Sequence, residues 1–294
     1  MMQPVRAGQG TLAIIGVGLV GGSFAAALRA GGHVGRVVGV DPDPEALQRA
    51  LALGLIDASA DLARAAHADL VLLATPVRAM GSILSSLAPL LASHTVVTDV
   101  GSTKVDVVSA ARAALGGRIG QFVPGHPIAG GERTGPDAAD ASLYRGREVI
   151  LSPLPENDAA TVARVREAWQ ACGATVRDMS AADHDAVFAS VSHLPHLLAA
   201  VYMAAVVQAD NAAVRLGHAG TGFRDFTRIA AGSPEVWRDI FLSNAAPLRE
   251  ELRTVRGLLD AVDRALEEGD GSALESLLDV AAEARRAWPS GRHL

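Results

Sequence analysis

One histidine in this chain stands in a segment that restricts the backbone on both sides. His126 lies between a glycine and a proline in the run Val123-Pro-Gly-His-Pro-Ile-Ala-Gly-Gly-Glu132. An imidazole titrates near neutral pH, so it can accept the proton of a substrate hydroxyl that lies within hydrogen-bonding reach. Proline fixes φ, and a restricted backbone presents the ring without needing flexibility. The setting predicts a general base, with a histidine that only caps a turn as the alternative.

A glycine-rich turn near the start of the chain predicts a dinucleotide site. Gly16-Val-Gly-Leu-Val-Gly21 follows an apolar segment typical of a strand and opens a predicted helix. In this pattern Gly16 permits the tight turn, Gly18 lets a pyrophosphate approach the backbone, and Gly21 lets helix and strand pack closely. The N-terminus of the helix then offers free N–H groups and a positive dipole to the phosphates.

Asp41 favours NAD over NADP. It closes the second predicted strand, twenty residues after Gly21, where a carboxylate can accept hydrogen bonds from both hydroxyls of the adenine ribose. The 2′-phosphate of NADP would instead meet two carboxylates, Asp41 and Asp43. A glycine turn needed only for packing, with Asp41 as a helix cap, is the alternative. The expected NAD-binding residues are Gly16, Gly18, Leu19, Val20, Gly21, Asp41 and Thr75.

Alternating strands and helices must position these residues. Apolar runs predict strands at residues 11–15, 36–41, 69–74 and 95–99, with helices at 19–29, 44–53, 77–91 and 104–115. Repeated strand–helix units with apolar strands indicate a parallel sheet covered on both faces. The sheet is expected to continue with strands near 120–124, 148–151 and 175–178, with a helix at 159–171 between the last two.

The second part of the chain shows only helical patterns. We expect helices at residues 186–208, 235–242, 246–268 and 272–287. At 294 residues the chain suits two domains of about 150 residues each. The prediction is therefore an α/β Rossmann-like nucleotide-binding domain at residues 1–180, followed by an all-α helical domain at residues 181–294.

Composition narrows the class of protein. The chain is 49% hydrophobic and 20% charged, as globular proteins are, and its net charge of −6 gives no footprint for nucleic acid or anionic lipid. Cys172 is the single cysteine, which excludes an intrachain disulfide and favours a reducing cytoplasm. Residues 7–28 carry no charge and could be a signal peptide or membrane span, but glycines at motif spacing favour a buried strand, turn and helix.

Five segments, in order, resemble the prephenate/arogenate dehydrogenases. They begin at Gly16-Val-Gly-Leu-Val-Gly-Gly-Ser and continue through Asp99-Val-Gly-Ser-Thr-Lys104, Gly125-His-Pro-Ile-Ala-Gly-Gly-Glu132, Ser192-His-Leu-Pro-His196 and Phe226-Thr-Arg228. The match extends from about residue 12 to at least residue 248. The resemblance implies oxidative decarboxylation of a cyclohexadienol on the route to tyrosine, with NAD(P) accepting the hydride.

The resemblance also implies roles for residues of the first part of the chain. His126 takes the proton of the ring hydroxyl, and Ser102 hydrogen-bonds the same hydroxyl or helps to fix the imidazole. Glu132 matches an acidic position that looks like part of a gate over the substrate, with a solvent-facing loop glutamate as the alternative. We expect the substitution of His126 by asparagine to depress turnover at least ~10²-fold and to leave NAD binding intact.

Residues of the second part are expected to bind a dianionic substrate. Arg228 matches the arginine that binds the ring carboxylate in the family, and a planar guanidinium suits a carboxylate. Arg224 is the competing cation. The alternative for Arg228 is a salt bridge at the surface. By resemblance His196 contacts the substrate and His193 is more often structural, and a core or helix-capping histidine is the alternative for both. Trp237 falls where a substrate-side aromatic is expected, or in the core.

A metal site is not expected, because the His193 and His196 pair lacks a third ligand at a recognisable spacing. The helical region looks like a pairing surface in the family, so we expect a homodimer. Taken together, the residues predict an NAD-dependent prephenate dehydrogenase that forms 4-hydroxyphenylpyruvate.

Three alternatives stay open. The substrate could be arogenate, which differs only in an amino group on the side chain. The chain could be another two-domain dehydrogenase, such as a β-hydroxyacid dehydrogenase or pyrroline-carboxylate reductase, although residues 185–287 contain no lysine for the lysine-dependent kind. It could also be a non-catalytic NAD-binding sensor, which would have no need for Ser102, His126, His196 and Arg228 together.

Overall fold

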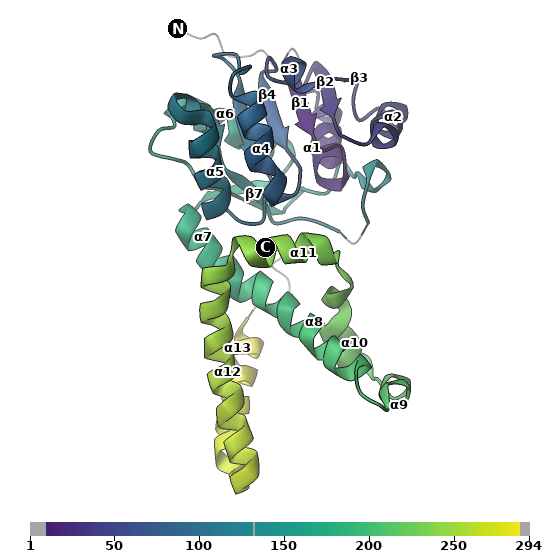
Figure 1. The fold of residues 1–294 in the computed structure, drawn as a ribbon, viewed down its shortest axis with the longest axis vertical. Helices are drawn as coiled ribbons and strands as arrows, with labels where there is room; N and C mark the ends of the chain where they lie inside the picture. The colour runs from purple at the N-terminus through teal and green to yellow at the C-terminus, as the bar shows by residue number, and fades with distance from the viewer. Residues whose placement is uncertain (1–9, 132, 289–294) are drawn as a thin grey trace. The chain divides into compact units, whose positions relative to one another are not determined.

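A computed structural model describes residues 10–131 and 133–288 of the chain and divides it into two compact units (Figure 1). The sheet unit comprises residues 1–187 and 231–244, and the helical unit comprises residues 188–230 and 245–294. The sequence places the domain boundary at residue 180, whereas residues 181–187 and 231–244 group with the sheet. One reason is the hydrogen bond that Asn244 Nδ2 donates to the backbone oxygen of Asp185, at 2.7 Å.

The sheet unit is built on six parallel strands in the order β3-β2-β1-β4-β5-β6. The order reverses direction beside β1, where β2 and β4 flank it. The crevice at the carboxyl ends of strands at such a reversal is the usual ligand site of open α/β sheets. The strands are β1 (Thr11–Ile15), β2 (Arg36–Val40), β3 (Ala58–Ser59), β4 (Leu70–Leu73), β5 (Val96–Asp99) and β6 (Phe122–Val123).

Helices cover both faces of this sheet, as the strand composition predicts. Their apolar side chains form two hydrophobic clusters, one on each face. On one face lie α1 (Leu19–Ala30), α2 (Pro44–Ala52) and α6 (Ala159–Ala171); on the other lie α3 (Leu62–Ala65), α4 (Val77–Leu87) and α5 (Val105–Leu115).

The first cluster holds three buried aromatic rings that pack edge to face. Phe24 lies 4.5 Å from Trp169 between ring centroids, and Tyr144 lies 5.1 Å from Trp169. Burial of each such side chain contributes about 1.5–3 kcal/mol. The sheet unit therefore has a core that fixes the strand ends.

A second, smaller sheet differs from the expectation that the later strands continue the first one. Here β7 (Gly125–Pro127) pairs antiparallel with β8 (Glu148–Leu151), and β8 pairs parallel with β9 (Thr175–Asp178). Pro124 has no backbone N–H to donate, which favours the break between β6 and β7. His126 consequently lies within a strand, opposite Ile150, rather than in a loop.

The helices of the second part begin earlier and are more broken than their patterns predict. The predicted helix 186–208 is α7 (Ala181–Phe188), a π-helical turn (Ala189–His193) and α8 (Leu194–Val207). Among residues 181–288 the structure contains no strand, as expected. The remaining helices are α9 (Ala212–Gly217), α10 (Thr221–Thr227), a 3₁₀ turn (Arg228–Ala231), α11 (Pro234–Ser243), α12 (Ala245–Glu268) and α13 (Gly271–Ala287).

Candidate active site

The glycine turn between β1 and α1 has the geometry that a dinucleotide needs. Gly16 adopts φ +97°, a conformation open to glycine, and a Cβ there would lie 2.2 Å from the backbone oxygen of Ala74. A Cβ on Gly21 would lie 2.2 Å from the oxygen of Gly16. A Cβ on Gly18 would meet no atom within 4 Å. Packing therefore requires the first and third glycines, whereas the space over Gly18 is open to a ligand.

The groups around this turn fit a pyrophosphate and a ribose. No side chain caps the N-terminus of α1, so its first N–H groups point into the turn. Asp41 follows β2 and accepts hydrogen bonds from the backbone of Val17 and Asp43, each at 3.0 Å. Asp43, and not Asp41, caps α2 by accepting from the backbone N–H of Glu45. The alternative role of Asp41 as a helix cap is therefore wrong.

A pocket of about 440 Å³ opens over the turn. Gly18, Leu19, Val20 and Thr75 line it, and so does Ser102, which follows β5. The Thr75 hydroxyl is buried and has no hydrogen-bond partner among the described residues. Such a buried polar group is costly unless it is satisfied, so the pocket offers it to a bound cofactor. The residues present thus fit NAD.

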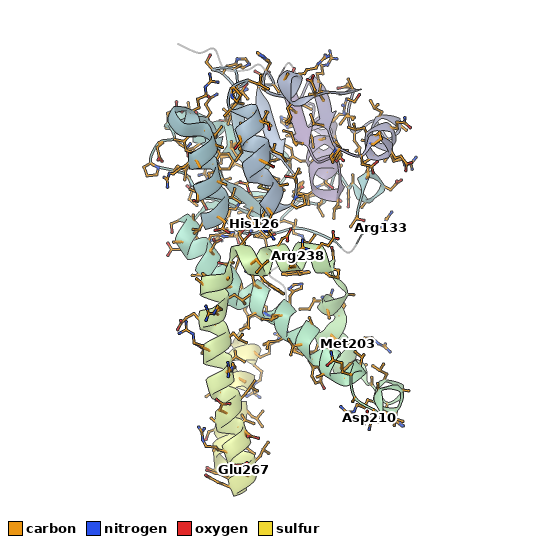
Figure 2. The ribbon with its side chains drawn as sticks, viewed as in Figure 1. His126, Arg133, Met203, Asp210, Arg238 and Glu267 are labelled. Carbon is orange, nitrogen blue, oxygen red and sulfur yellow. The ribbon has the colours of Figure 1, made fainter. Side chains whose placement is uncertain are left out.

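His126 is held by its strand and by the residue before it. A Cβ on Gly125 would lie 3.0 Å from the backbone oxygen of Asp99, so glycine favours this close approach of β7 to the end of β5. The Gly125 N–H donates to Asp99 Oδ1 at 3.0 Å. Figure 2 shows the half-buried side chain of His126 at the same end of the sheet unit as Arg133, a lining residue of the pocket.

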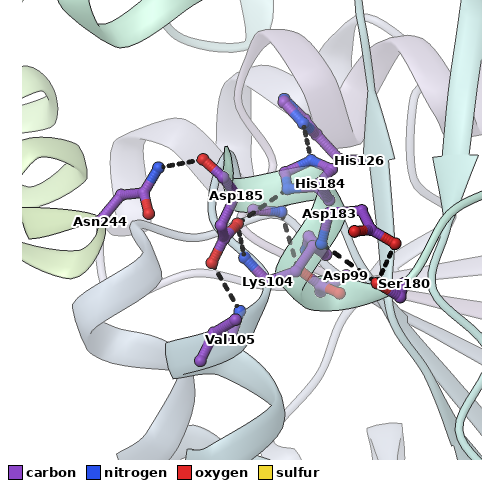
Figure 3. Close-up of polar contacts among 10 residues, drawn as sticks. Asp99, Lys104, Val105, His126, Ser180, Asp183, His184, Asp185 and Asn244 are labelled. Carbon is purple, nitrogen blue, oxygen red and sulfur yellow. Dashed lines mark hydrogen bonds and ion pairs between the residues drawn. The ribbon is translucent and has the colours of Figure 1, made fainter. Parts of the chain in front are cut away.

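A buried hydrogen-bond network stands behind His126 (Figure 3). Its Nδ1 lies 2.8 Å from Nε2 of His184, and Nδ1 of His184 lies 2.8 Å from Oδ1 of Asp185. The Asp185 carboxylate accepts from the backbone N–H groups of Lys104 and Val105, at 2.7 and 2.8 Å. Two side chains of α7 therefore hold the ring of a β7 residue.

A second buried carboxylate ties the Ser102 loop into the same network. Asp99 Oδ2 accepts from the backbone N–H of Gly101 at 2.8 Å and from Lys104 Nζ at 2.5 Å. Both ion-pair side chains are fully buried. Burial lowers the pKa of Lys104, and the charge of Asp99 acts in the opposite direction. This pair fixes the loop that carries Ser102 relative to the strand that carries His126.

The electrostatics of His184 favour its neutral form. Burial lowers the pKa of His184, although its hydrogen bond to Asp185 acts in the opposite direction. Asp106 lies close to Asp185, and burial raises the pKa of Asp106. Burial therefore favours the neutral form of the imidazole that lies beside the Asp185 carboxylate.

The expected substrate residues of the helical unit lie near one another. His196, half-buried on α8, donates from Nδ1 to the backbone oxygen of Ser192 at 2.9 Å. Burial lowers the pKa of His196, the Ser192 oxygen raises it, and the positive charge of Arg228 lowers it further. Arg228 is therefore close enough to act on His196. His193 is buried in the π-helical turn, as a structural histidine would be.

Trp237 and Glu132 are the other two expected substrate residues. Trp237 is on α11, in the sheet unit, where its half-buried ring packs against Phe241 with centroids 5.6 Å apart. The neighbouring Asp239 and Ile240 line the pocket over the glycine turn. Glu132, the expected gate residue, lies outside the described residues. Within the described part of the chain, no group of three or more His, Cys, Asp or Glu side chains could hold a metal ion.

Comparison with known protein families covers both units. The model of the prephenate dehydrogenase nucleotide-binding domain matches residues 24–178, and that of the prephenate dehydrogenase dimerization domain matches residues 180–280. The chain belongs to the prephenate dehydrogenase family. Its predicted family, its fold class and the expectation of an NAD-dependent dehydrogenase are confirmed by these matches and by the relatives below.

Three members of the prephenate dehydrogenase family are similar to this chain over nearly its whole length. The cyclohexadienyl dehydrogenase of Zymomonas mobilis is 37% identical, over 94% of this chain and 95% of that protein. The crystal structure of Aquifex aeolicus prephenate dehydrogenase with hydroxyphenyl propionate and NAD+ matches with a TM-score of 0.87 and 35% identity, over 96% and 99% of the two chains. Synechocystis arogenate dehydrogenase matches with a TM-score of 0.81 and 28% identity, over 95% and 100%.

The sequence predictions assigned no role to four residues of this candidate site. Asp99 and Lys104 stand in the quoted segment Asp99-Val-Gly-Ser-Thr-Lys104, and two charged residues flanking a Gly-Ser turn were the available signal. His184 and Asp185 had no comparable signal. Nothing in the spacing of an adjacent histidine and aspartate shows that they meet a histidine 58 residues earlier in the chain.

Proposed function

We propose that this chain is an NAD-dependent prephenate dehydrogenase that converts prephenate to 4-hydroxyphenylpyruvate. One observation carries the proposal: a dinucleotide turn with an open space over Gly18 shares a unit with a histidine whose ring is anchored to a buried carboxylate. A non-catalytic NAD sensor would need the turn and have no use for the anchored imidazole.

The residues of the sheet unit supply proton transfer and orientation. Gly16, Gly18, Leu19, Val20, Gly21, Asp41 and Thr75 hold the cofactor. NAD+, when bound, accepts the hydride of the ring carbon. His126 accepts the hydroxyl proton of the same carbon, which makes hydride loss easier, and Ser102 donates or accepts a hydrogen bond at that hydroxyl. Loss of carbon dioxide then yields an aromatic ring, so the protein mainly orients reactants and excludes water.

Cationic and polar side chains bind the substrate. Arg228 pairs with the ring carboxylate, and His196, whose Nδ1 donates to the backbone oxygen of Ser192, contacts the substrate. Trp237 packs against the side chain of the substrate, and Glu132 controls entry. Arg224 stays the competing cation for Arg228.

One assay tests the activity and the choice of substrate. Purified protein is given prephenate or arogenate with NAD or NADP, in all four combinations, and NADH or NADPH absorbance is followed. We expect the highest kcat/KM with prephenate and NAD. A preference for arogenate would make arogenate, and not prephenate, the substrate. A preference for NADP would contradict the role of Asp41. No reduction in any combination would overturn the proposed function.

We propose further that the helical unit pairs two copies of the chain in the cytoplasm. Its family model is described as a dimerization domain. The exposed large apolar side chains of α8, α12 and α13 support pairing, since monomeric proteins rarely expose many of them together. They include Val201, Tyr202 and Val207 on α8, Leu258, Leu259 and Leu266 on α12, and Leu277, Leu278 and Val280 on α13.

One stretch that includes α8 is apolar enough to be mistaken for a membrane span. The stretch Ala181–Val207 is long and apolar enough to cross a membrane by length and composition alone. Buried His184 and Asp185 lie inside it, and Pro195 follows the π-helical turn. Sedimentation of the purified protein tests the pairing: we expect a dimer without detergent, and a detergent requirement would contradict it.

A further inference from the structure

The network behind His126 ends in a carboxylate whose only available role is that of an acceptor. Asp185 Oδ1 and Oδ2 accept from the backbone N–H groups of Lys104 and Val105, at the N-terminus of α5. Both oxygens of Asp185 thus already accept backbone hydrogens. Asp185 is therefore the acceptor in its contact with the imidazole beside it.

The proton of His184 is fixed by this acceptor. Nδ1 of His184 lies 2.8 Å from Asp185 Oδ1, so Nδ1 must carry the hydrogen. Burial lowers the pKa of His184 and favours the neutral ring. A neutral imidazole with a hydrogen on Nδ1 has a lone pair on Nε2. Nε2 of His184 is therefore an acceptor.

The proton of His126 follows in turn. Its Nδ1 lies 2.8 Å from the accepting Nε2 of His184, and a hydrogen bond between two nitrogens contains one hydrogen. That hydrogen must belong to Nδ1 of His126. In the neutral ring Nε2 then carries the lone pair. An isolated neutral histidine prefers the opposite tautomer, with its hydrogen on Nε2, in which that nitrogen could not accept a proton.

We propose that Asp185 and His184 are positioning residues that set the tautomer of His126, so that its Nε2 is the nitrogen that accepts the proton of the substrate. This inference rests on the proposed function for its catalytic consequence. During the reaction the O–H bond of the substrate breaks, an N–H bond forms at Nε2, and the carbon loses its hydride to the cofactor. The Nδ1–H of His126 stays bonded to His184 throughout.

The same arrangement stabilises the charge that the reaction creates. When His126 becomes an imidazolium, its Nδ1–H still donates to His184, and the negative charge of Asp185 lies one ring further away. The other charged groups of the network are the Asp99 and Lys104 ion pair and Asp106. A carboxylate that orients an imidazole and stabilises its charged form plays the same part in serine hydrolases.

The tautomer can be read directly and without substrate. In protein labelled with ¹⁵N-histidine, long-range ¹H–¹⁵N correlation spectra distinguish a protonated Nδ1 from a protonated Nε2, and the His126→Asn variant identifies the signals of His126. We expect neutral wild-type His126 to carry its hydrogen on Nδ1. A hydrogen on Nε2 in the wild-type protein would overturn the inference, whatever the enzyme assay shows.

A pair of variants then tests the consequence for catalysis. His184→Gln keeps a carbonyl oxygen that can accept from His126 Nδ1, whereas His184→Phe keeps a ring and loses the acceptor. We expect His184→Phe to lower kcat by ~10- to 10²-fold, part of what a general base contributes, with the Kd for NAD unchanged. His184→Gln should retain most of the wild-type kcat and the Nδ1 tautomer. Equal losses in both variants would contradict the inference.

The two proposals fail in different ways. Absence of turnover in all four combinations of substrate and cofactor would remove the proposed function and leave the tautomer measurement to decide the inference. Turnover with an Nε2–H tautomer would keep the function and remove the inference. Because the wild-type spectrum decides, the inference stays testable even where His184→Phe does not fold.

Discussion

The sheet unit and the helical unit hold their candidate residues in different ways. In the sheet unit His126 stands on a network of buried groups in which Asp99, Lys104, His184 and Asp185 all have partners. In the helical unit Arg228 is exposed, and apolar side chains line the outer faces of α8, α12 and α13. The candidate base of the sheet unit is therefore held by buried partners of its own unit, whereas Arg228 stands at the surface of the helical unit.

His126 and His196 differ in the same way in the hydrogen bond that holds each ring. Nδ1 of His126 is bonded to a side chain 58 residues away in the sequence, and Nδ1 of His196 is bonded to the carbonyl of Ser192 in the preceding helical turn. The first bond depends on the packing of several elements. The second is available to any helix with a histidine at this place, so we expect His196 to affect affinity more than turnover.

The largest expected effect tests whether the chemistry belongs to the sheet unit. His126→Asn should lower kcat by ~10²- to 10⁴-fold, because the positioned base is lost while the cofactor pocket is intact. The Kd for NAD, measured by calorimetry, should be unchanged. His33→Asn, at an exposed histidine of the same unit, is the matched control and should retain full activity. Unaltered turnover in His126→Asn would remove this histidine from the mechanism.

The buried ion pair provides the next test. Lys104→Met leaves the Asp99 carboxylate fully buried without its countercharge, which typically costs about 3–5 kcal/mol in the free energy of unfolding. Urea unfolding of the two proteins measures the loss. Arg112→Gln, which breaks the exposed pair with Glu156, should leave the unfolding midpoint nearly unchanged. Similar losses of unfolding free energy in both variants would show that the buried ion pair contributes no more to stability than an exposed one.

A third test concerns the helical unit. Arg228→Gln should raise the KM for prephenate by ~10- to 10²-fold, since a charged hydrogen bond to a carboxylate is lost, with a smaller change in kcat. Steady-state kinetics separates the two effects. Arg224→Gln is the matched control, and a larger effect there would transfer the role to Arg224. A fall in kcat with an unchanged KM would contradict a substrate-binding role for Arg228.

The smallest expected effect is a dependence of stability on pH. Because burial lowers the pKa of His184 from its ordinary value of 6.5, the unfolded chain binds a proton there more readily than the folded chain does. The free energy of unfolding should therefore decrease as the pH falls below 6.5, with a contribution of up to about 1.4 kcal/mol per pH unit. His184→Gln should show a weaker dependence in urea unfolding. The contributions of Asp106 and His196 cancel in the difference between the two proteins. An equal pH dependence of stability in both proteins would contradict a buried neutral ring at His184.

Much of the sheet unit could be predicted from local patterns. The strands at 11–15 and 148–151 and the helix at 159–171 have their expected bounds. The glycine turn has the positive φ at Gly16 and the close packing at Gly21 that the motif predicts, because each requirement is local to the turn or to the strand beside it. The second sheet was missed because β7 has three residues, too few to show a period.

The sequence by itself determined the nucleotide-binding fold and the family, and it predicted His126 as the candidate base, since these inferences depend on strand periods, a glycine spacing and ordered motifs within short stretches. Only the tertiary structure decided what lies behind His126. The bonds that join it to His184, and Lys104 to Asp185, span 58 and 81 residues. No local pattern encodes which buried polar groups satisfy one another, because that depends on how strands and helices pack.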